Sequence, residues 1–408
     1  MKSKSNRALS LQPATKLPLP GQIFFSMLDK LEHGMLDVTT PEGLVRSFGK
    51  TSSDVNAQLH IHDWQASHLI LVQGDIGFAE SVRRGWVSSP DLLALFRLAI
   101  HNQQVLEQAI HGKWWALLVR RLSHLWLHAN SRSGSKRNIH AHYDLGNDFY
   151  QHWLDPSMTY SAAWFGKQRE QSLEQAQHAK YQRILDELDA QPGQHILEIG
   201  CGWGGFAEYA AQRGFKVDGI TLSPAQLAFA EQRIHRQGLD ALVTLRLQDY
   251  RDLDGQYDHI VSIEMLEAVG ETHWQRYFSI LQHCLKPGGK VVIQCIDIAD
   301  RYFPHYRSST DFIQQFIFPG GMLPCPSSLY THAQRAGLKV KRLQSFGQDY
   351  AHTLHLWHQR FMSQLSAIRA QGFDDAFIRL WEMYLKYCEA GFIEQRTDVK
   401  LWTLHRHQ

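Results

Sequence analysis

The chain has 408 residues, a formal net charge of +2, 44% hydrophobic residues and 20% charged residues, so it is an ordinary globular protein long enough for two domains. Its five cysteines are far apart and include no Cys-x-x-Cys pair, which excludes a disulfide framework or a cysteine zinc site. No stretch approaches the roughly 18 apolar residues of a membrane span, and no secretory leader is expected.

The first 125 residues predict a small α+β domain without obvious chemistry. Gln58–Trp64 alternates between apolar and polar side chains like a half-buried strand, and Ser89-Pro90-Asp91 precedes an apolar run as a helix start does. A polar, basic stretch at 130–137 has the turn residues of a linker. We therefore expect one domain at 1–125 and a second at 126–408.

Segments with the lengths of strands and helices alternate from residue 191 onward. The predicted strands are His195–Ile199, Lys216–Thr221, Val243–Leu247, Asp258–Ile263 and Lys290–Ile296. This alternation is typical of βα units. It predicts an α/β fold with a doubly wound, mostly parallel sheet, whose ligand lies outside the carboxyl ends of the strands.

A glycine-rich turn follows the first of these strands, with the sequence Glu198-Ile-Gly200-Cys-Gly202-Trp-Gly204. Glycines let the backbone turn sharply and approach a ligand where a Cβ atom would collide. The spacing differs from the Gly-x-Gly-x-x-Gly of dinucleotide-binding enzymes. It resembles the S-adenosylmethionine loop of class I methyltransferases, so the three glycines are predicted to bind that cofactor.

Polar residues follow the second strand, where most nucleoside-binding sheets place an acidic residue on the ribose hydroxyls. Thr221 and Gln226 offer neutral hydrogen bonds there instead. Ser223 is also the expected cap of the helix that Pro224 begins, and the two roles are compatible because they share one turn.

Two further positions come after the third and fourth strands. Gln248 and Asp249 follow the third strand, where a contact with an adenine ring would fall. Glu267 follows the fourth strand. A surface glutamate is the commoner interpretation of a strand end, but the position of Glu267 in this fold favours a role in the site.

Six longer motifs extend the resemblance over nearly the whole chain. They are Gly74–Glu80, Asn138–Asn147, Ile199–Gly204, Gln248–Asp252, Asp311–Gly321 and Tyr387–Phe392. Through them the chain resembles the cyclopropane-fatty-acyl-phospholipid synthases and their mycolic-acid relatives. The resemblance implies methyl transfer from S-adenosylmethionine to the cis double bond of an acyl chain on a membrane phospholipid, which forms a cyclopropane fatty acid. It also implies that the N-terminal domain engages lipid.

The resemblance assigns the cofactor shell to Tyr160, Ser161, Gly200, Gly202, Thr221, Leu222, Gln226 and Asp249. It implies that helices inserted at about 351–392 wall an apolar acyl tunnel, before a last edge strand at Val399–Leu404. Cys388 matches a cysteine suspected of catalysis in the family. A helix-borne cysteine among Tyr384, Leu385 and Phe392 is, on physical grounds, better interpreted as buried and inert.

In the family, a bound bicarbonate removes a proton after methyl transfer. The resemblance places such an anion against Glu267, the backbone of Ile296 and Tyr350. The sequence departs at two positions, because Ala162 replaces the family's cysteine and Gln294 replaces its histidine. Gln294 donates a hydrogen bond but cannot carry a proton, and losing two anchors costs about 1–3 kcal/mol each, enough to empty a weak site.

Two outcomes of these departures stay open. In one, the carbocation left by methyl transfer relaxes by a hydride shift and loses a neighbouring proton, which gives a methyl-branched, still unsaturated acyl chain. In the other, the anion or base is placed differently and the product is still a cyclopropane. Bicarbonate is therefore in doubt as a second cofactor.

The sequence disfavours two other function classes and a metal site. A protein that binds cofactor or lipid without turnover is disfavoured by the intact cofactor shell. An RNA methyltransferase is disfavoured because the chain has no strongly basic face and no amino-methylating motif, so no nucleic-acid partner is expected. His352, His355 and His358 recur every three residues but point away from one another around a helix, so no metal is expected.

The expected partner is a membrane phospholipid with an unsaturated acyl chain. We expect a cytoplasmic protein that acts transiently at the inner face of the membrane, and a homodimer is one expected state. Five basic residues form the one concentration of positive charge: Arg120, Arg121, Arg132, Lys136 and Arg137. They form either a solvated linker or a docking patch for anionic head groups, worth about 1 kcal/mol per cation.

Overall fold

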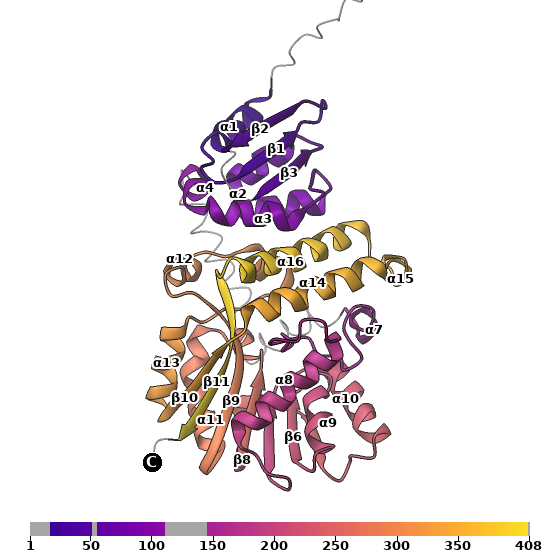
Figure 1. The fold of residues 1–408 in the computed structure, drawn as a ribbon, viewed down its shortest axis with the longest axis vertical. Coiled ribbons are helices and arrows are strands. Elements are labelled where there is room, and N and C mark those ends of the chain that lie inside the picture. The colour runs from indigo at the N-terminus through magenta and orange to yellow at the C-terminus, as the bar shows by residue number, and fades with distance from the viewer. Residues whose placement is uncertain (1–16, 51–54, 111–144, 407–408) are drawn as a thin grey trace, which may run out of the picture.

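The computed structural model describes residues 17–50, 55–110 and 145–406, which form two units stacked along the long axis (Figure 1). The predicted domain boundary after residue 125 lies outside the described residues. The division into domains 1–125 and 126–408 therefore stays a prediction.

A four-stranded sheet with the strand order β2-β1-β3-β4 forms the centre of the N-terminal unit. Its strands are β1 (Met35–Thr39), β2 (Val45–Gly49), β3 (Asn56–Ile61) and β4 (Val87–Ser88), and its helices are α1 (Leu19–Leu28), α2 (Gln65–Arg83), α3 (Leu92–His101) and α4 (Gln103–Ile110). The strand predicted at Gln58 is present but ends at Ile61. The predicted helix start is confirmed, because the Asp91 side chain caps α3 by accepting from the Ala94 N–H over 2.9 Å.

The C-terminal unit is built on a seven-stranded sheet with the order β10-β11-β9-β8-β5-β6-β7. The five predicted strands are all present, as β5 (His195–Ile199), β6 (Lys216–Thr221), β7 (Val243–Leu247), β8 (Tyr257–Ile263) and β9 (Leu285–Ile298). All their mutual pairings are parallel, which confirms the predicted doubly wound α/β fold.

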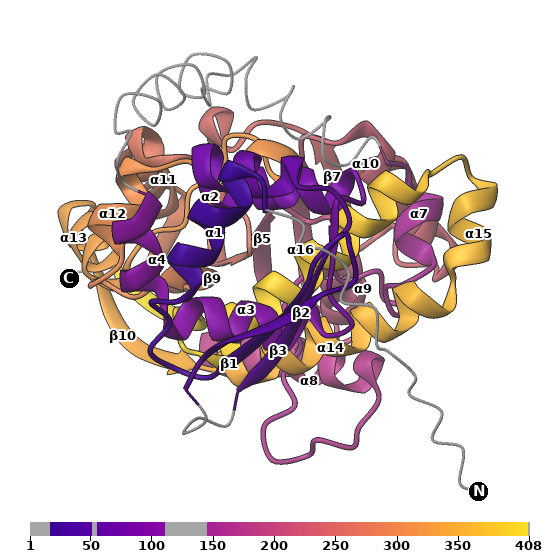
Figure 2. The ribbon, with the colours of Figure 1, turned by 90° about the horizontal axis from the view of Figure 1, so that it is seen from above.

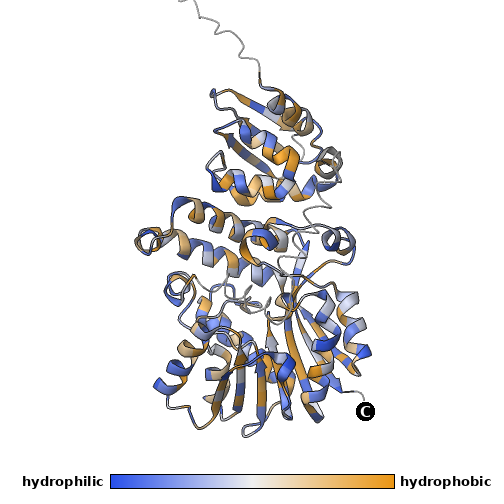
Figure 3. Cartoon of the chain, turned by 180° about the vertical axis from the view of Figure 1, so that it is seen from behind, coloured by the Kyte–Doolittle hydropathy of each residue, from blue (hydrophilic) through white to orange (hydrophobic). Residues whose placement is uncertain are grey.

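Helices cover both faces of this sheet. Residues of β5 alternate between the faces, because Ile196 packs into a cluster with α8 and α9 while Leu197 packs into a cluster with α11 and α13. Figure 3 shows hydrophobic residues along the strands of the sheet. The covering helices are α8 (Leu173–Leu188), α9 (Gly205–Ala211), α10 (Pro224–Arg236), α11 (Trp274–Cys284) and α13 (Pro326–Arg335). Shorter helical segments are α7 (Asn147–Gln151), α12 (Phe303–Ser308), Tyr250–Asp252, Leu266–Ala268, Glu271–His273 and a π-helical turn at Ile313–Ile317.

The last strand is not an edge strand, which corrects the prediction. β11 (Thr397–Arg406) lies between β9 and β10 (Leu338–Ser345), antiparallel to both. β10 was not predicted, because it carries three basic side chains and buries only Leu338. Such a pattern is typical of a true edge strand, which uses charge to avoid pairing with other chains.

A layer of helices separates the large sheet from the N-terminal unit. It consists of α14 (Gly347–Ser363), α15 (Leu365–Ala370) and α16 (Asp375–Ile393), and confirms the predicted helical insertion (Figure 1). Figure 2 shows α14 and α16 beneath the N-terminal unit. α16 packs on α2 and α3, where Phe96 and Tyr387 stand edge to face at 5.5 Å.

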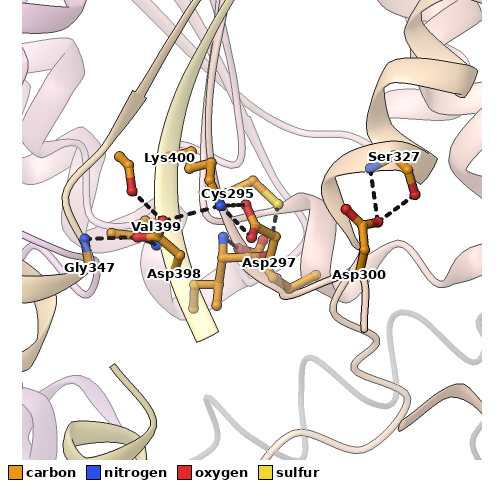
Figure 4. A network of polar contacts seen from close by, with 11 residues as sticks. Cys295, Asp297, Asp300, Ser327, Gly347, Asp398, Val399 and Lys400 are labelled. Carbon is orange, nitrogen blue, oxygen red and sulfur yellow. Dashed lines mark hydrogen bonds and ion pairs between the residues drawn. The ribbon is translucent and has the colours of Figure 1, made fainter. Parts of the chain in front are cut away.

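A polar network fixes the start of α14 against the sheet (Figure 4). Oδ1 of Asp398 on β11 accepts from the Gly347 N–H at the first turn of α14 over 3.0 Å. Nζ of Lys400, on the same strand, lies 2.7 Å from Oδ2 of the buried Asp297 on β9. Through β11, this network therefore fixes the position of the first turn of α14 relative to β9.

Candidate active site

A first cavity opens at the carboxyl ends of β5 and β6, and we call it the glycine-loop cavity. Its wall includes Gly200 and Gly202 from the turn after β5 and Thr221 from the end of β6. Gly200 has a φ of +85°, and a Cβ atom there would lie 2.9 Å from Cγ of Met265. Only glycine fits this turn without displacing its neighbour.

Eight of the ten residues predicted to bind the cofactor line this cavity. They are Tyr160, Ser161, Gly200, Gly202, Thr221, Leu222, Gln226 and Gln248. The other two, Gly204 and Asp249, do not line the cavity, although each is next in sequence to a residue or turn that does. Gly204 immediately precedes α9 and lies against Ala230, whereas the Asp249 carboxylate pairs with Arg251 at 2.6 Å and orders the turn after β7.

The turn after β6 places Thr221 and Gln226 at the cavity and also caps the helix that follows. The Thr221 hydroxyl donates to Oε1 of Gln226 over 3.0 Å, and both residues line the cavity. The Ser223 hydroxyl accepts from the Gln226 N–H, which confirms Ser223 as the cap of α10. The neutral side chains of Thr221 and Gln226 are therefore held in place by hydrogen bonds at the first turn of α10.

The segment that carries Tyr160 and Ser161 is fastened to α14. The Ala163 N–H donates to the Thr353 hydroxyl over 3.1 Å, and the Phe165 N–H donates to the Asp349 carboxylate over 2.9 Å. Both acceptors lie on α14. The helical layer therefore positions one wall of the glycine-loop cavity.

Two buried charged residues at this cavity were not predicted as site residues. Glu198 lies near the end of β5 and lines the cavity, and its Oε2 atom has no hydrogen-bond partner among the described residues. Lys180 on α8 donates to the Ser161 hydroxyl over 2.6 Å. Burial lowers the pKa of Lys180 to about 7 and raises the pKa of Glu198 well above its ordinary value. A cationic ligand such as S-adenosylmethionine would favour the charged form of Glu198, and the Oε2 atom could accept a hydrogen bond from it.

A second and larger cavity, of about 570 Å³, lies between the sheet, the helical layer and the N-terminal unit. We call it the apolar cavity. Leu354, Tyr384 and Phe392 from α14 and α16 line it, which confirms that the inserted helices wall an apolar space. The N-terminal unit lines it as well, through residues that include Leu28 and Ile70. This volume is within the range of sites for organic ligands.

The two cavities are adjacent and share part of their walls, and we call this shared part their junction. Tyr160, Glu264 and Ala268 line both of them. A group that projects from a ligand in the glycine-loop cavity therefore meets a chain in the apolar cavity next to Glu264. No role for Glu264 was predicted from the sequence.

Glu264 follows β8 and its carboxylate accepts three hydrogen bonds. Oε1 accepts from the Ala162 N–H over 2.8 Å and from Nε2 of Gln294 over 2.7 Å, and Oε2 accepts from the Tyr350 hydroxyl over 2.7 Å. The φ of Glu264 is +48°, in the left-handed region that non-glycine residues seldom adopt. The surroundings over-determine this conformation, which is typical of functional sites.

Glu267 lies one helical turn further along the chain and lines the apolar cavity. Its Oε1 atom accepts from the Ile296 N–H over 2.6 Å, and Oε2 has no partner among the described residues. Burial and the adjacent Glu264 carboxylate raise the pKa of Glu267 to about 8. The pKa of Glu264 is also raised by burial, but its three donors and Lys180 oppose that shift. The pair therefore favours a charged Glu264 beside a neutral Glu267.

The predicted anion-site residues are brought together, but they do not fit a bound bicarbonate. Gln294 and Tyr350 donate to Glu264, and Ile296 donates to Glu267. These donors are satisfied by carboxylates of the chain itself. A further anion would stand against two acidic side chains, which is electrostatically unfavourable.

Aromatic rings surround the junction of the cavities. Tyr160 and Phe318 stack at 6.3 Å, the Tyr160 hydroxyl lies 2.9 Å from the Tyr384 hydroxyl, and Tyr350 packs on Phe392 at 4.5 Å. All five line the apolar cavity. Such ring faces stabilise a positive charge that develops nearby.

Cys388 lines the apolar cavity, but its thiol is not activated. Burial raises the pKa of Cys388 far above its ordinary value, so the thiol stays protonated. The Asp311 carboxylate adds to this shift, because a negative neighbour opposes formation of a thiolate. This environment argues against a nucleophilic role.

Within the described residues, no His, Cys, Asp and Glu side chains are grouped so as to hold a metal ion. No helix in the same ranges is long and apolar enough to cross a bilayer. The basic residues at 120, 121, 132, 136 and 137 lie outside the described part of the chain.

Comparisons with known proteins agree with this geometry. A family model described as mycolic acid cyclopropane synthetase matches residues 130–402. A tuberculostearic acid methyltransferase of Mycobacterium tuberculosis is 40% identical over 341 residues, covering 82% of this chain and 79% of that protein. The cyclopropane-fatty-acyl-phospholipid synthase of Escherichia coli is 34% identical over 339 residues, covering 82% and 83%.

Solved structures show the same architecture. A mycolic acid cyclopropane synthase complexed with SAH and CTAB aligns with a TM-score of 0.62 and 30% sequence identity, covering 66% of this chain and 97% of that one. A cyclopropane synthase from Mycobacterium tuberculosis gives the same TM-score, identity and coverage.

Proposed function

This chain belongs to the mycolic acid cyclopropane synthetase family of S-adenosylmethionine-dependent methyltransferases, which act on lipid acyl chains, and from that premise we propose that it methylates the cis double bond of an unsaturated acyl chain carried on a membrane phospholipid. The observation that carries the proposal is the junction of the two cavities at Tyr160, Glu264 and Ala268.

The glycine-loop cavity suits the methyl donor. Gly200 and Gly202 allow close approach of its backbone, Thr221 and Gln226 offer neutral hydrogen bonds, and Glu198 offers a carboxylate. When bound, S-adenosylmethionine supplies an electrophilic methyl group. These residues of the glycine-loop cavity would hold the donor beside Glu264, and such positioning is what a weak nucleophile such as an alkene needs.

We propose a methyl-branched, still unsaturated acyl chain as the product. Methyl transfer leaves a carbocation on the acyl chain, and the aromatic rings at the junction stabilise it within a mostly apolar cavity. The Glu264 carboxylate is held by three donors, which makes it a weaker base than a free carboxylate in the same place. A slow proton transfer leaves time for a hydride shift to the more stable, more substituted cation.

A cyclopropane product is the second candidate. It is favoured by the names of the family model and of the Escherichia coli relative. It requires that a proton leave the new methyl group before any hydride shift. Both products arise from the same methyl transfer, so they differ only in the fate of the cation.

The phospholipid is the proposed partner because the apolar cavity is large and continues into the N-terminal unit. We propose that the protein works from the cytoplasm at the inner face of the membrane. A homodimer stays a prediction.

The test is incubation of the full chain with S-adenosylmethionine carrying a trideuterated methyl group and vesicles of a monounsaturated phospholipid. Acyl chains are then analysed by mass spectrometry before and after catalytic hydrogenation. A methylated alkene gains two hydrogens on hydrogenation, whereas a cyclopropane keeps its mass under mild conditions. Cyclopropane alone would refute the proposed product, and the absence of any methylated chain would refute the proposed methyl transfer.

A further inference from the structure

We infer that Glu264 is the proton acceptor of this reaction, a carboxylate built into the chain at the place where the family resemblance implies a separate bound anion. This role rests on the proposed function, because it concerns the fate of the cation that methyl transfer leaves. Neither the sequence motifs nor the comparisons single out Glu264.

Glu264 lies at the junction of the two cavities. Glu264 is the only acidic residue, among those described, that lines both cavities. Part of its side chain stays open to the cavities although it is enclosed from bulk solvent. A base at this junction reaches a proton on the transferred methyl group or on the adjacent chain carbons.

Three hydrogen bonds hold the Glu264 carboxylate. The Ala162 N–H and Nε2 of Gln294 both donate to Oε1 of Glu264, and Nε2 of Gln294 also donates to the Ala162 carbonyl over 3.2 Å. Ala162, one of the two departures from the family pattern, is completely buried and donates its backbone N–H to Glu264. Gln294, the other departure, donates from its neutral side-chain amide. Both departures therefore contact Glu264.

The two neighbouring carboxyl groups also differ in charge. Lys180 attracts the Glu264 carboxylate, whereas Glu264 raises the pKa of Glu267. Glu267 is the neutral member of the pair near neutral pH and does not compete as a base. The charged Glu264 also lies beside the site of the developing cation, where opposite charge lowers the barrier.

The step balances in atoms and electrons. The alkene π electrons form the new bond to the methyl carbon, and the carbon–sulfur bond breaks with its electron pair going to sulfur. A hydride moves from the methylated carbon to the neighbouring cationic carbon. Glu264 then takes a proton from a carbon next to the new cation, and the electrons of that C–H bond form the double bond of the product.

The experiment compares the unaltered full chain with Glu264→Gln, Glu264→Gly and Glu389→Gln. Glu389 is the matched control, because it is a buried glutamate on α16 that pairs with Lys386 and lines neither cavity. Each protein is given labelled S-adenosylmethionine and monounsaturated phospholipid vesicles, in buffer freed of carbon dioxide and in the same buffer with bicarbonate or formate. Acyl products are quantified by mass spectrometry, and the affinity for S-adenosylhomocysteine (SAH) is measured by calorimetry.

We expect the unaltered protein to be equally active with and without bicarbonate. We expect Glu264→Gln to lose about 100-fold or more of its product formation while it still binds SAH, and Glu389→Gln to keep its activity. Added formate or bicarbonate should restore part of the activity of Glu264→Gly, in which a small anion replaces the lost carboxylate.

Either of two results would overturn this role: full activity of Glu264→Gln, or loss of activity of the unaltered protein when bicarbonate is removed. The second result needs no variant and therefore holds even if the substitutions prevent folding. A failure of the proposed function is distinguishable, because the unaltered protein would then form no methylated acyl chain under any of these conditions.

Discussion

Replacing Tyr350 by phenylalanine is expected to move the pH dependence of product formation. The Tyr350 hydroxyl donates to Oε2 of Glu264 over 2.7 Å, and burial keeps the pKa of Tyr350 well above its ordinary value, so the hydroxyl stays a donor. This hydrogen bond stabilises the charged form of Glu264. Its removal therefore raises the pKa of Glu264.

The size of the shift follows from the kind of bond. A buried hydrogen bond to a charged group contributes about 1.5–3 kcal/mol, and each pKa unit corresponds to about 1.4 kcal/mol. We expect the rising acid limb of product formation to move up by about 1–2 pH units in Tyr350→Phe. The sign is upward because a base with a raised pKa is ionised only at higher pH.

The assay is the initial rate of acyl product formation across pH, at saturating S-adenosylmethionine and with unsaturated phospholipid vesicles. Tyr384→Phe is the matched control, because the Tyr384 hydroxyl contacts Tyr160 and not Glu264. Its rate can change, but its acid limb is expected to stay in place. An unmoved limb in Tyr350→Phe, or equal shifts in both variants, would refute a role for Tyr350 in tuning Glu264.

Three further outcomes are expected. Ile70→Trp narrows the part of the apolar cavity that the N-terminal unit lines. It is expected to lower kcat/KM for longer acyl chains relative to shorter ones, by about tenfold or more for each methylene group that no longer fits. The measurement compares phospholipids of defined acyl chain length. Cys388→Ser is expected to keep methyl transfer, measured as SAH release, because the Cys388 thiol is protonated; loss of turnover with intact SAH binding would contradict this. Lys400→Met leaves the buried Asp297 carboxylate without its ion-pair partner. The variant is expected to lower the free energy of unfolding, measured by urea denaturation, by about 3–5 kcal/mol. An unchanged midpoint of urea denaturation would contradict this.

Much of the fold could be predicted because its signals are local. The parallel strands carry apolar side chains at successive or alternate positions, and turn residues lie between them and the helices, so all five were predicted. β10 was missed because its alternation of Leu338 and Val340 with lysines is short and breaks at the register shift before Arg342. The place of β11 inside the sheet could not be predicted, since strand order depends on long-range pairing and not on the strand's own sequence.

The cofactor cavity was easier to predict than the base. The glycine turn acts through its own backbone, and the Thr221 hydroxyl contacts residues close to it in the chain, so a short motif records both. Glu264 and Glu267, by contrast, are two glutamates three positions apart, and nothing local separates their roles. Only the left-handed φ of Glu264 and the donors from Ala162, Gln294 and Tyr350 hold its carboxylate at the junction.

If Glu264 replaces a separate anion, the exchange should be reversible by design. The triple variant Glu264→Gly, Ala162→Cys and Gln294→His removes the carboxylate, relaxes the left-handed turn with a glycine and restores the two side chains of the family pattern. We expect its product formation to depend on added bicarbonate. Ala162→Cys with Glu264 still present is the control, and because Ala162 is completely buried we expect overpacking to cost about 1–3 kcal/mol of stability without any gain from bicarbonate. A triple variant that folds and binds SAH but stays inactive with bicarbonate would show that the two arrangements are not interchangeable.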